Sequence, residues 1–288
     1  MITWPRNLVN DIARRKTVVF LGSGISRNSV NREGLRPPTW EGFLRMALDR
    51  VENDRGDIER FIKEKDYLTA CEIIFNKLGK VAFNDLAVDI FQRPGFESHG
   101  IHESIFKLDS RIVATPNVDK IYDTYANTVS RATVAVKNYY DSDLANKIRS
   151  QDYIIVKVHG TIEAPDGMIF TRRQYTEARY RNASFYQILS ALALTHTFVF
   201  LGCGLNDPDI RLILESYTFT HPNCRPHYFV TSSDNITNDF KKTISENLSL
   251  EMLTYSSQNE HRELSISLAN LVLLVEEERE EIASKLNW

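Results

Sequence analysis

Two kinds of hydrophobic pattern alternate along this chain. Short runs of apolar and β-branched residues are typical of buried strands, and apolar residues that recur every three or four positions indicate helices. The first strand run is 17–21, Thr-Val-Val-Phe-Leu. Further strand runs are found at 111–115, 132–136, 153–158, 197–201, 227–230 and 250–254. From residue 111 onward a helical pattern follows most strands, so the sequence predicts a parallel, doubly wound sheet.

Residues 39–108 carry helical patterns and no strand run. Their clearest helix begins after Thr39, a favourable N-cap residue. Its apolar positions have the spacing of one buried helical face, and they are Trp40, Phe43, Leu44, Ala47, Leu48 and Val51. The segment therefore predicts a mostly helical lobe inserted after the first strand. The whole pattern predicts an α/β fold with a mostly parallel, Rossmann-like sheet, followed by a long helix over 261–286.

Composition and charge narrow the function classes. The chain has 288 residues, 42% of them hydrophobic, and a net charge of −3. We therefore expect a soluble protein that has no general affinity for nucleic acid. No apolar run reaches 18 residues and the amino terminus lacks a signal-peptide core, so neither a membrane span nor secretion is predicted. Three separated cysteines exclude a four-cysteine zinc site within this chain and fit a reducing cytoplasm. They are Cys71, Cys203 and Cys224.

The stretch that directly follows the first strand is Gly-Ser-Gly-Ile-Ser-Arg, residues 22–27. Glycines at the carboxyl end of a strand let the backbone approach a phosphate, and the N–H groups of the next helix favour its negative charge. A dinucleotide fingerprint would have a third glycine where Arg27 lies, and an acidic residue about 20 positions later. Taken alone, the stretch is equally open to interpretation as a tight turn without a ligand.

Polar residues and glycines follow three further strands. Asn117 and Asp119 follow the second strand, His159 and Gly160 follow the strand at 153–158, and the segment 202–207 follows the strand at 197–201. Ligands bind at the carboxyl edge of such sheets, so the four strand ends predict one pocket. Each residue also has a structural interpretation. Asn117, Asp119 and Asp207 could cap helices, and His159 could be a core histidine whose ring nitrogens bond to backbone.

Together these motifs resemble those of sirtuins. Residues 22–26 resemble the sirtuin Gly-Ala-Gly-x-Ser, residues 115–119 resemble Thr-Gln-Asn-Ile/Val-Asp, and His159-Gly160 resembles the catalytic His-Gly. The resemblance runs over about 17–255. It is closer to the sirtuin-like domains of bacterial antiphage defence systems, which have a Thr-x-x-x-Tyr segment and a Gly-Tyr-Ser-Leu-x-Asp-Pro motif. Residues 171–175 and 202–208 are similar to these.

The resemblance implies a sirtuin-like NAD-binding domain over 1–260, with the lobe at 39–108, and a C-terminal helix over 261–288. It implies hydrolysis of NAD to nicotinamide and ADP-ribose. Asn117 would orient the attacking water, and His159 would act as general base. Asp119 would contact the nicotinamide carboxamide. The expected NAD-binding residues are Gly22, Ser23, Gly24, Ser26, Arg27, Thr115, Asp119, Gly202 and Asn206.

Departures from the sirtuin pattern leave two other functions open. This chain lacks the four-cysteine zinc module of sirtuin deacylases, which argues against protein deacylation, and no metal is expected. Pro116 and Gly204 replace the usual glutamine and serine. The alternatives are a zinc-free deacylase or ADP-ribosyltransferase, and a scaffold subunit that binds NAD or ADP-ribose without turnover.

A constantly active NAD hydrolase would poison its host, so we expect control by a partner or by self-assembly. Related defence domains are fused to, or encoded beside, a HerA-type hexameric ATPase or a short Argonaute-like protein. The resemblance therefore implies a homo-oligomer that pairs with a HerA-type ATPase, and less strongly one that pairs with a short Argonaute-like protein. Direct binding to nucleic acid or to a membrane is not expected.

Overall fold

The computed structural model describes residues 1–150, 152–205, 207–234 and 236–285. Within these residues a sheet of seven parallel strands has the order β3-β4-β2-β1-β5-β6-β7. The strands are β1 (Thr17–Leu21), β2 (Ile112–Thr115), β3 (Ala135–Asn138), β4 (Ile154–Lys157), β5 (Thr197–Leu201), β6 (His227–Ser232) and β7 (Leu250–Tyr255). The predicted doubly wound α/β fold is confirmed. β3 begins three residues later than its apolar run, which starts at residue 132.

Helices cover both faces of the sheet because successive side chains of each central strand point to opposite sides. Val19 and Leu21 of β1 point into one core, and Val18 and Phe20 point into the other. The first core is closed by α1 (Arg6–Ala13), α7 (Gly100–Lys107), α8 (Ile121–Val129) and α14 (Gln258–Ser284). The second is closed by α9 (Leu144–Arg149), α11 (Ala183–Thr195), α12 (Pro208–Thr220) and α13 (Asn238–Leu248).

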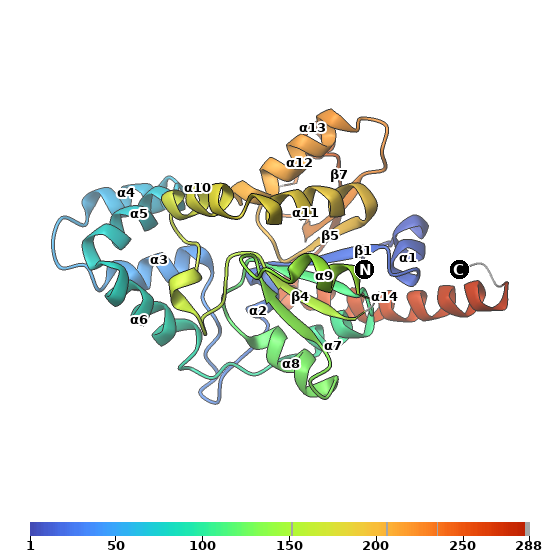
Figure 1. Ribbon diagram of the computed structural model, residues 1–288, viewed down its shortest axis with the longest axis horizontal. Helices are drawn as coiled ribbons and strands as arrows, with labels where there is room; N and C mark the ends of the chain where they lie inside the picture. Colours follow the sequence, from blue (N-terminus) through green and yellow to red (C-terminus); the bar gives the residue numbers. More distant parts are fainter. Residues whose placement is uncertain (151, 206, 235, 286–288) are drawn as a thin grey trace.

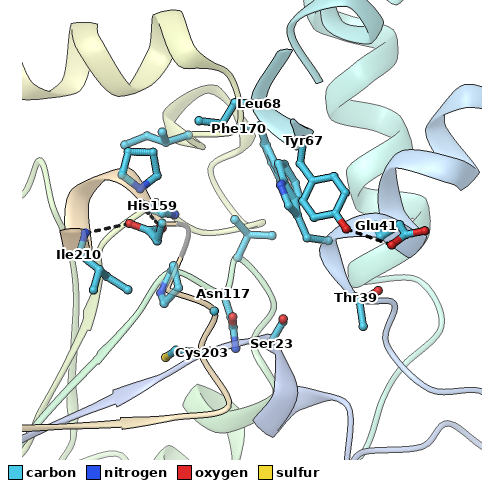
Figure 2. A pocket seen from close by; sticks show the side chains of 18 of the residues that line it. Ser23, Thr39, Glu41, Tyr67, Leu68, Asn117, His159, Phe170, Cys203 and Ile210 are labelled. Atoms are coloured by element: carbon cyan, nitrogen blue, oxygen red, sulfur yellow. Dashed lines mark hydrogen bonds and ion pairs between the residues drawn. The ribbon is translucent and has the colours of Figure 1, made fainter. Parts of the chain in front are cut away.

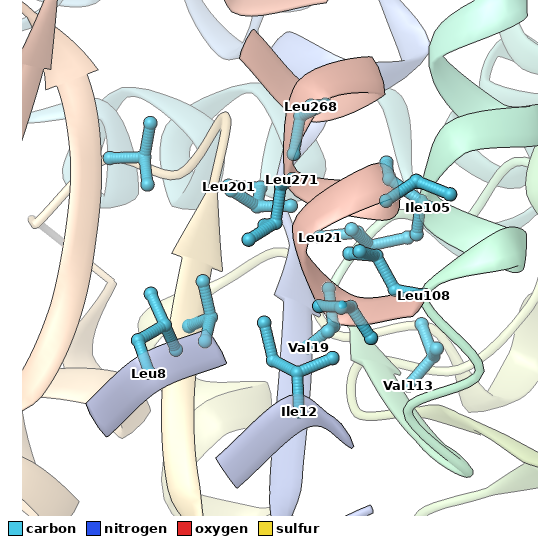
Figure 3. Close-up of a cluster of buried hydrophobic side chains, with 14 of the residues drawn as sticks. Leu8, Ile12, Val19, Leu21, Ile105, Leu108, Val113, Leu201, Leu268 and Leu271 are labelled. Carbon is cyan, nitrogen blue, oxygen red and sulfur yellow. The ribbon is translucent and has the colours of Figure 1, made fainter. Parts of the chain in front are cut away.

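Figure 3 shows how the first core joins the two ends of the chain. Leu8 and Ile12 of α1, together with Leu268 and Leu271 of α14, surround the strand residues Val19 and Leu21. Three residues near the start of α14, Asn259, Glu260 and His261, have positive φ, so the regular helix begins after them. The C-terminal segment expected at 261–288 is thus packed into the main core over its described part. No described helix is both long and apolar enough to cross a membrane.

The inserted lobe has a core of its own. It consists of α3 (Trp40–Leu48), α4 (Gly56–Lys63), α5 (Tyr67–Leu78) and α6 (Lys80–Phe91), which lie beside the sheet in Figure 1. Thr39 caps α3 as predicted, since its side chain accepts a hydrogen bond from the Gly42 N–H. The segment expected to form the lobe, 39–108, also includes α7, but Ile101 and Ile105 of α7 are buried in the first core of the sheet. By packing, the lobe therefore ends with α6.

The sequence patterns did not predict the helix α10 (Arg172–Arg181), which runs from the lobe toward α11. Its sequence has few apolar residues and so lacks a buried stripe. A capping box starts it: the Thr171 hydroxyl accepts from the Gln174 N–H, and the Gln174 side chain accepts from the Thr171 N–H. The remaining short elements are α2 (Ser23–Ser26) and the 3-10 turn η1 (Pro165–Gly167).

Candidate active site

A cavity of about 680 Å³ lies between the carboxyl ends of β1, β2, β4 and β5 and the helical lobe. Its volume is typical of sites for small molecules and cofactors. Figure 2 shows Tyr67 and Glu41 of the lobe on one side and His159 on the other, with Asn117 and Ser23 below them. The four predicted strand ends therefore do meet at one pocket.

A chain of hydrogen bonds fixes the side chain of Asn117. Its amide Nδ2 donates to the Ser26 hydroxyl over 3.0 Å, and that hydroxyl donates to Asp119 Oδ2 over 2.8 Å. The other carboxylate oxygen of Asp119 accepts from the Ile121 N–H and so caps α8. Thr115 supports the loop from behind, because its hydroxyl accepts from the Asn117 N–H and donates to the Leu21 carbonyl. The amide is thus held in one orientation at the floor of the cavity.

His159 is buried beside two carboxylates. Its Nε2 lies 3.5 Å from Asp207 Oδ2 and 3.7 Å from Asp209 Oδ2, and its Nδ1 lies 3.5 Å from the Tyr175 hydroxyl. These separations are longer than ordinary hydrogen bonds. The carboxylates therefore act on the imidazole mainly through their charge and leave its nitrogens available for a substrate. Burial alone would lower the pKa of His159, but the charge of Asp207, together with that of Asp209, outweighs it, and the pKa is raised.

The two carboxylates are themselves anchored. Asp207 Oδ1 accepts from the Asp209 and Ile210 N–H groups and caps α12, and its Oδ2 accepts from the Tyr175 hydroxyl. Asp209 accepts from Arg179 Nε at 2.6 Å and from the Tyr186 hydroxyl at 3.0 Å. Burial alone would raise the pKa of Asp209, but its contacts with His159 and Arg179 lower it. An ionised Asp209 therefore stabilises a protonated His159.

Gly22 and Gly24 allow the loop after β1 to pack closely against the loop after β5. A Cβ on Gly22 would lie 2.3 Å from the Gly202 carbonyl oxygen, and one on Gly24 would lie 2.9 Å from the Gly202 Cα. The Gly22 and Gly24 N–H groups donate to the carbonyls of Leu201 and Gly202. The donors of these two glycines are thus used between the loops in this structure, and the predicted contact of the glycine loop with NAD remains a prediction.

The structure brings together six of the residues predicted for the site. Gly22, Ser23, Ser26, Asn117, Asp119 and His159 line the cavity. Gly24, Thr115 and Gly202 lie behind this lining, where they support the loops, and Arg27 lies at the end of α2. Asn206 lies outside the described residues. None of these positions by itself tests the predicted contact with NAD, which remains a prediction.

The sequence patterns did not predict the aromatic wall on the lobe side of the cavity. Trp40 lines the cavity and stacks with Phe43 and Phe170, at ring-centroid distances of 5.6 Å for both pairs. Tyr67 lines it as well and donates from its hydroxyl to Glu41 at 3.0 Å. The helical spacing of Trp40 predicted a core position, and it gave no sign that one edge of that core would border the cavity.

The sequence patterns identified Tyr175 only as the last residue of the Thr-x-x-x-Tyr segment at 171–175. The capping box at Thr171 and Gln174 is the sequence signal that places it on the first turn of α10. There its ring meets that of His159 at a centroid distance of 4.9 Å. Burial raises the pKa of Tyr175, so its hydroxyl stays protonated and can donate to Asp207.

No cluster of three or more His, Cys, Asp or Glu side chains suited to a metal ion is found among the residues that the structure describes. Cys203 lines the cavity, and burial raises the pKa of its thiol, which disfavours the reactive thiolate. The polar side chains that line the described cavity include an amide, carboxylates, hydroxyls and an imidazole.

Comparison with known proteins gives a family match for part of this chain. Residues 111–253 match the family model of the SIR2-like domain. The matched segment runs from the start of β2 into β7 and contains Asn117, Asp119 and His159. The predicted resemblance to sirtuin-like domains is confirmed over this segment.

Curated relatives extend the similarity beyond the SIR2-like segment. The chain is 29% identical over 199 residues to NAD(+) hydrolase ThsA of Cytobacillus dafuensis, an alignment that covers 68% of this chain and 37% of the relative. It is 25% identical over 227 residues to ThsA of Acinetobacter baumannii, which covers 77% and 44%. It is 26% identical over 205 residues to Defense-associated sirtuin 2 of Bacillus subtilis, which covers 69% and 19%. The matches thus span less than half the length of these relatives.

Proposed function

We propose that this chain is an NAD hydrolase that cleaves NAD to nicotinamide and ADP-ribose, and that it acts in antiphage defence by depleting NAD. One observation carries the proposal: Asn117 and His159, which follow different strands, line one cavity large enough for a cofactor. The relatives NAD(+) hydrolase ThsA and Defense-associated sirtuin 2 support the same function by similarity.

Cleavage of the bond between nicotinamide and ribose builds positive charge on the ribose, so catalysis requires positioning and charge stabilisation. The Asn117 Nδ2 is held by Ser26, which leaves the amide oxygen oriented to accept a hydrogen bond from the attacking water. Each Asp119 carboxylate oxygen accepts one internal hydrogen bond. Each also keeps a lone pair for a donor such as the nicotinamide carboxamide.

His159 would take a proton from that water or from a ribose hydroxyl. The imidazole becomes a cation in this step, and the carboxylates of Asp207 and Asp209 lie where they stabilise that cation. Because the same carboxylates raise the pKa of His159, the neutral, base-competent form becomes favoured at a higher pH than for an ordinary histidine. The same charges therefore stabilise the protonated product of the step and shift the active pH range upward.

Control of the activity belongs to the same proposal. An unregulated hydrolase would exhaust the NAD of its own cell, so we propose activation by self-assembly or by a partner. A HerA-type ATPase is our first choice and a short Argonaute-like protein the second, both on the family resemblance. The cell's cytoplasm, where NAD is abundant, is the proposed location.

The test identifies the products. The purified chain is incubated with NAD at several protein concentrations, alone and with a HerA-type ATPase, and nicotinamide and ADP-ribose are followed by chromatography. We expect both products in equal amounts, with a rate that rises steeply with protein concentration or on addition of the ATPase. Nicotinamide release that requires an acyl-lysine peptide would instead favour a deacylase. Tight NAD binding without any product would favour a scaffold subunit.

A further inference from the structure

Lys157 is a buried cation beneath the site. It is the last residue of β4, two positions before His159, and its exposed fraction is 1%. Lysine is almost never fully buried unless its charge is paired, because removal of an ammonium from water is costly. Lys157 does not line the large cavity, so this charge is not placed to touch a substrate there.

The ammonium of Lys157 contacts the neighbouring loop and helix at once. Its Nζ donates to the Asp119 backbone carbonyl over 2.6 Å, and it forms an ion pair of 3.1 Å with Asp123 Oδ2. Asp119 belongs to the loop after β2, and Asp123 belongs to the first turn of α8, where its exposed fraction is 4%. One side chain from β4 thus holds both the loop and the helix that follows it.

The hydrogen bond from Lys157 to Asp119 is connected to Asn117 by two further hydrogen bonds of the site. The Asp119 carboxylate accepts from Ser26, and Ser26 accepts from the Asn117 amide. Lys157, Asp119, Ser26 and Asn117 also line one small internal cavity of about 10 Å³. Lys157 therefore links the strand that carries His159 to the loop that carries Asn117.

Stability alone is a weak reason for this arrangement. A buried ion pair is often no better for folding than apolar residues of similar volume. Here the pair is also imperfectly satisfied, since Asp123 Oδ1 and His102 Nε2 have no hydrogen-bond partner among the described residues, and both residues border the small cavity. Burial accordingly raises the pKa of Asp123. What an apolar pair could not supply is the hydrogen bond to the Asp119 carbonyl.

We propose that Lys157 is a positioning residue, which fixes the Asn117 amide relative to His159 through its hydrogen bond to Asp119. The role rests on the proposed NAD hydrolysis, because Asn117 and His159 are the groups that it aligns. A displacement of about 1 Å between reacting groups can lower a rate on the order of 100-fold.

The test compares the single variant Lys157→Met with the double variant Lys157→Met/Asp123→Leu. The single variant leaves Asp123 buried without its cation and should lower the thermal unfolding midpoint, whereas the double variant removes both charges and should restore it. The matched control is Ile154→Ala, on the opposite face of the same strand, which destabilises the fold without touching the polar network. For each protein, kcat and KM for nicotinamide release are measured well below the unfolding midpoint.

We expect the double variant to regain wild-type stability and to keep an unchanged KM, with kcat lowered on the order of 100-fold. Ile154→Ala should keep its kcat. A double variant whose kcat equals that of the wild type would overturn the proposal and reduce the pair to a structural role.

A second readout separates this proposal from the proposed function. Amide hydrogen exchange in the double variant should become faster at 116–121 and stay unchanged in α11, because only that loop loses its anchor. If the wild type releases no nicotinamide under any condition, the proposed function fails, and the exchange result still decides whether Lys157 holds the loop. Unchanged exchange at 116–121 would show that it does not.

Discussion

The two sides of the cavity are built differently. The sheet-edge wall comes from loops after four strands and is polar, and its side chains are joined by buried hydrogen bonds such as that between Ser26 and Asp119. The lobe wall comes from helices and presents aromatic rings such as Trp40 and Tyr67. On the proposed function, this difference predicts that the chemistry depends on the sheet-edge wall and the fit of the substrate on the lobe wall.

The difference also concerns how rigidly each wall is held. The sheet-edge wall is fixed by parallel pairing, in which Thr115 of β2 lies beside Lys157 of β4. The lobe wall rests on the lobe core, to which Val118 and Phe170 contribute, and its contacts with α10 include an exposed ion pair between Asp66 and Arg172. We therefore expect substitutions in the sheet-edge wall to act mainly on kcat, and those in the lobe wall mainly on KM.

The largest effect is expected at His159. The change His159→Ala removes the proposed general base and should lower kcat by about 10²–10⁴-fold with little change in KM. Steady-state kinetics of nicotinamide release measure both constants. The control is His196→Ala, which alters a histidine that immediately precedes β5, at the edge of the sheet opposite the site. An unaltered kcat in folded His159→Ala would remove this side chain from the mechanism.

Trp40 is the corresponding position in the lobe wall. The change Trp40→Ala removes a ring that we expect to stack on one of the planar groups of NAD, and such contacts are worth roughly 1–3 kcal/mol. KM should therefore rise about 10-fold or more while kcat changes little, and Trp40→Phe should retain most of the affinity. Met46→Ala, on the exposed side of the same helix, is the control. A kcat effect as large as that of His159→Ala would erase the distinction between the two walls.

Charge within the sheet-edge wall should be visible as a pH dependence. Since His159 must be neutral to act as a base, kcat/KM should rise with pH through its raised pKa. Asp207→Asn removes the largest charge that raises this pKa but keeps a side chain able to cap α12, so the rising limb should move to lower pH. Rate measurements between pH 5 and pH 9, set about the ordinary histidine pKa of roughly 6.5, provide the test. A limb that does not move would exclude His159 as its origin.

The same pKa has a consequence for stability. The folded-state pKa of His159 lies above its unfolded value of about 6.5. Protonation of His159 therefore stabilises the fold fully below that unfolded value, and the stabilisation is lost as pH rises through the folded pKa. Asp207→Asn should make this loss smaller. Thermal unfolding of both proteins across the same pH range measures it.

The smallest effect is expected at the link between the walls. Arg172 and Asp66 form an ion pair of 3.2 Å whose side chains are 63% and 41% exposed. Arg172→Ala should change the free energy of unfolding by less than about 1 kcal/mol, because water screens such pairs. Denaturant titration measures this change. A larger loss would show that the lobe depends on α10 for its attachment.

Much of the fold could be predicted because its signals are local. β1 and β5 occupy the ranges that their apolar runs predicted, 17–21 and 197–201, since each strand is buried on both faces. The position of the site at the carboxyl edge of the sheet could also be predicted, because the loops after neighbouring parallel strands lie at the same edge. The polar residues Asn117 and His159 could thus be placed in one site from the sequence alone.

The rest depended on contacts between segments that are distant in sequence. Apolar spacing predicted that α7 is a helix but could not show that Ile101 packs beneath the sheet and not in the lobe. In the same way, Lys157 interrupts an apolar run, and nothing in that run indicates a partner at Asp123. Nor could the glycine spacing of the first loop show that the N–H groups of Gly22 and Gly24 donate to the carbonyls of Leu201 and Gly202.

The central claim is that Asn117 and His159 form one site for NAD cleavage. The most direct measurement compares the wild type with Asn117→Ala and His159→Ala, and records NAD binding by calorimetry and nicotinamide release by chromatography. Asn127→Ala, on the helix α8 that follows the loop, is the matched control. The account predicts that both site variants are folded, bind NAD and release nicotinamide at least about 100-fold more slowly, while the control behaves as the wild type does. Folded site variants that hydrolyse NAD at the wild-type rate would contradict it.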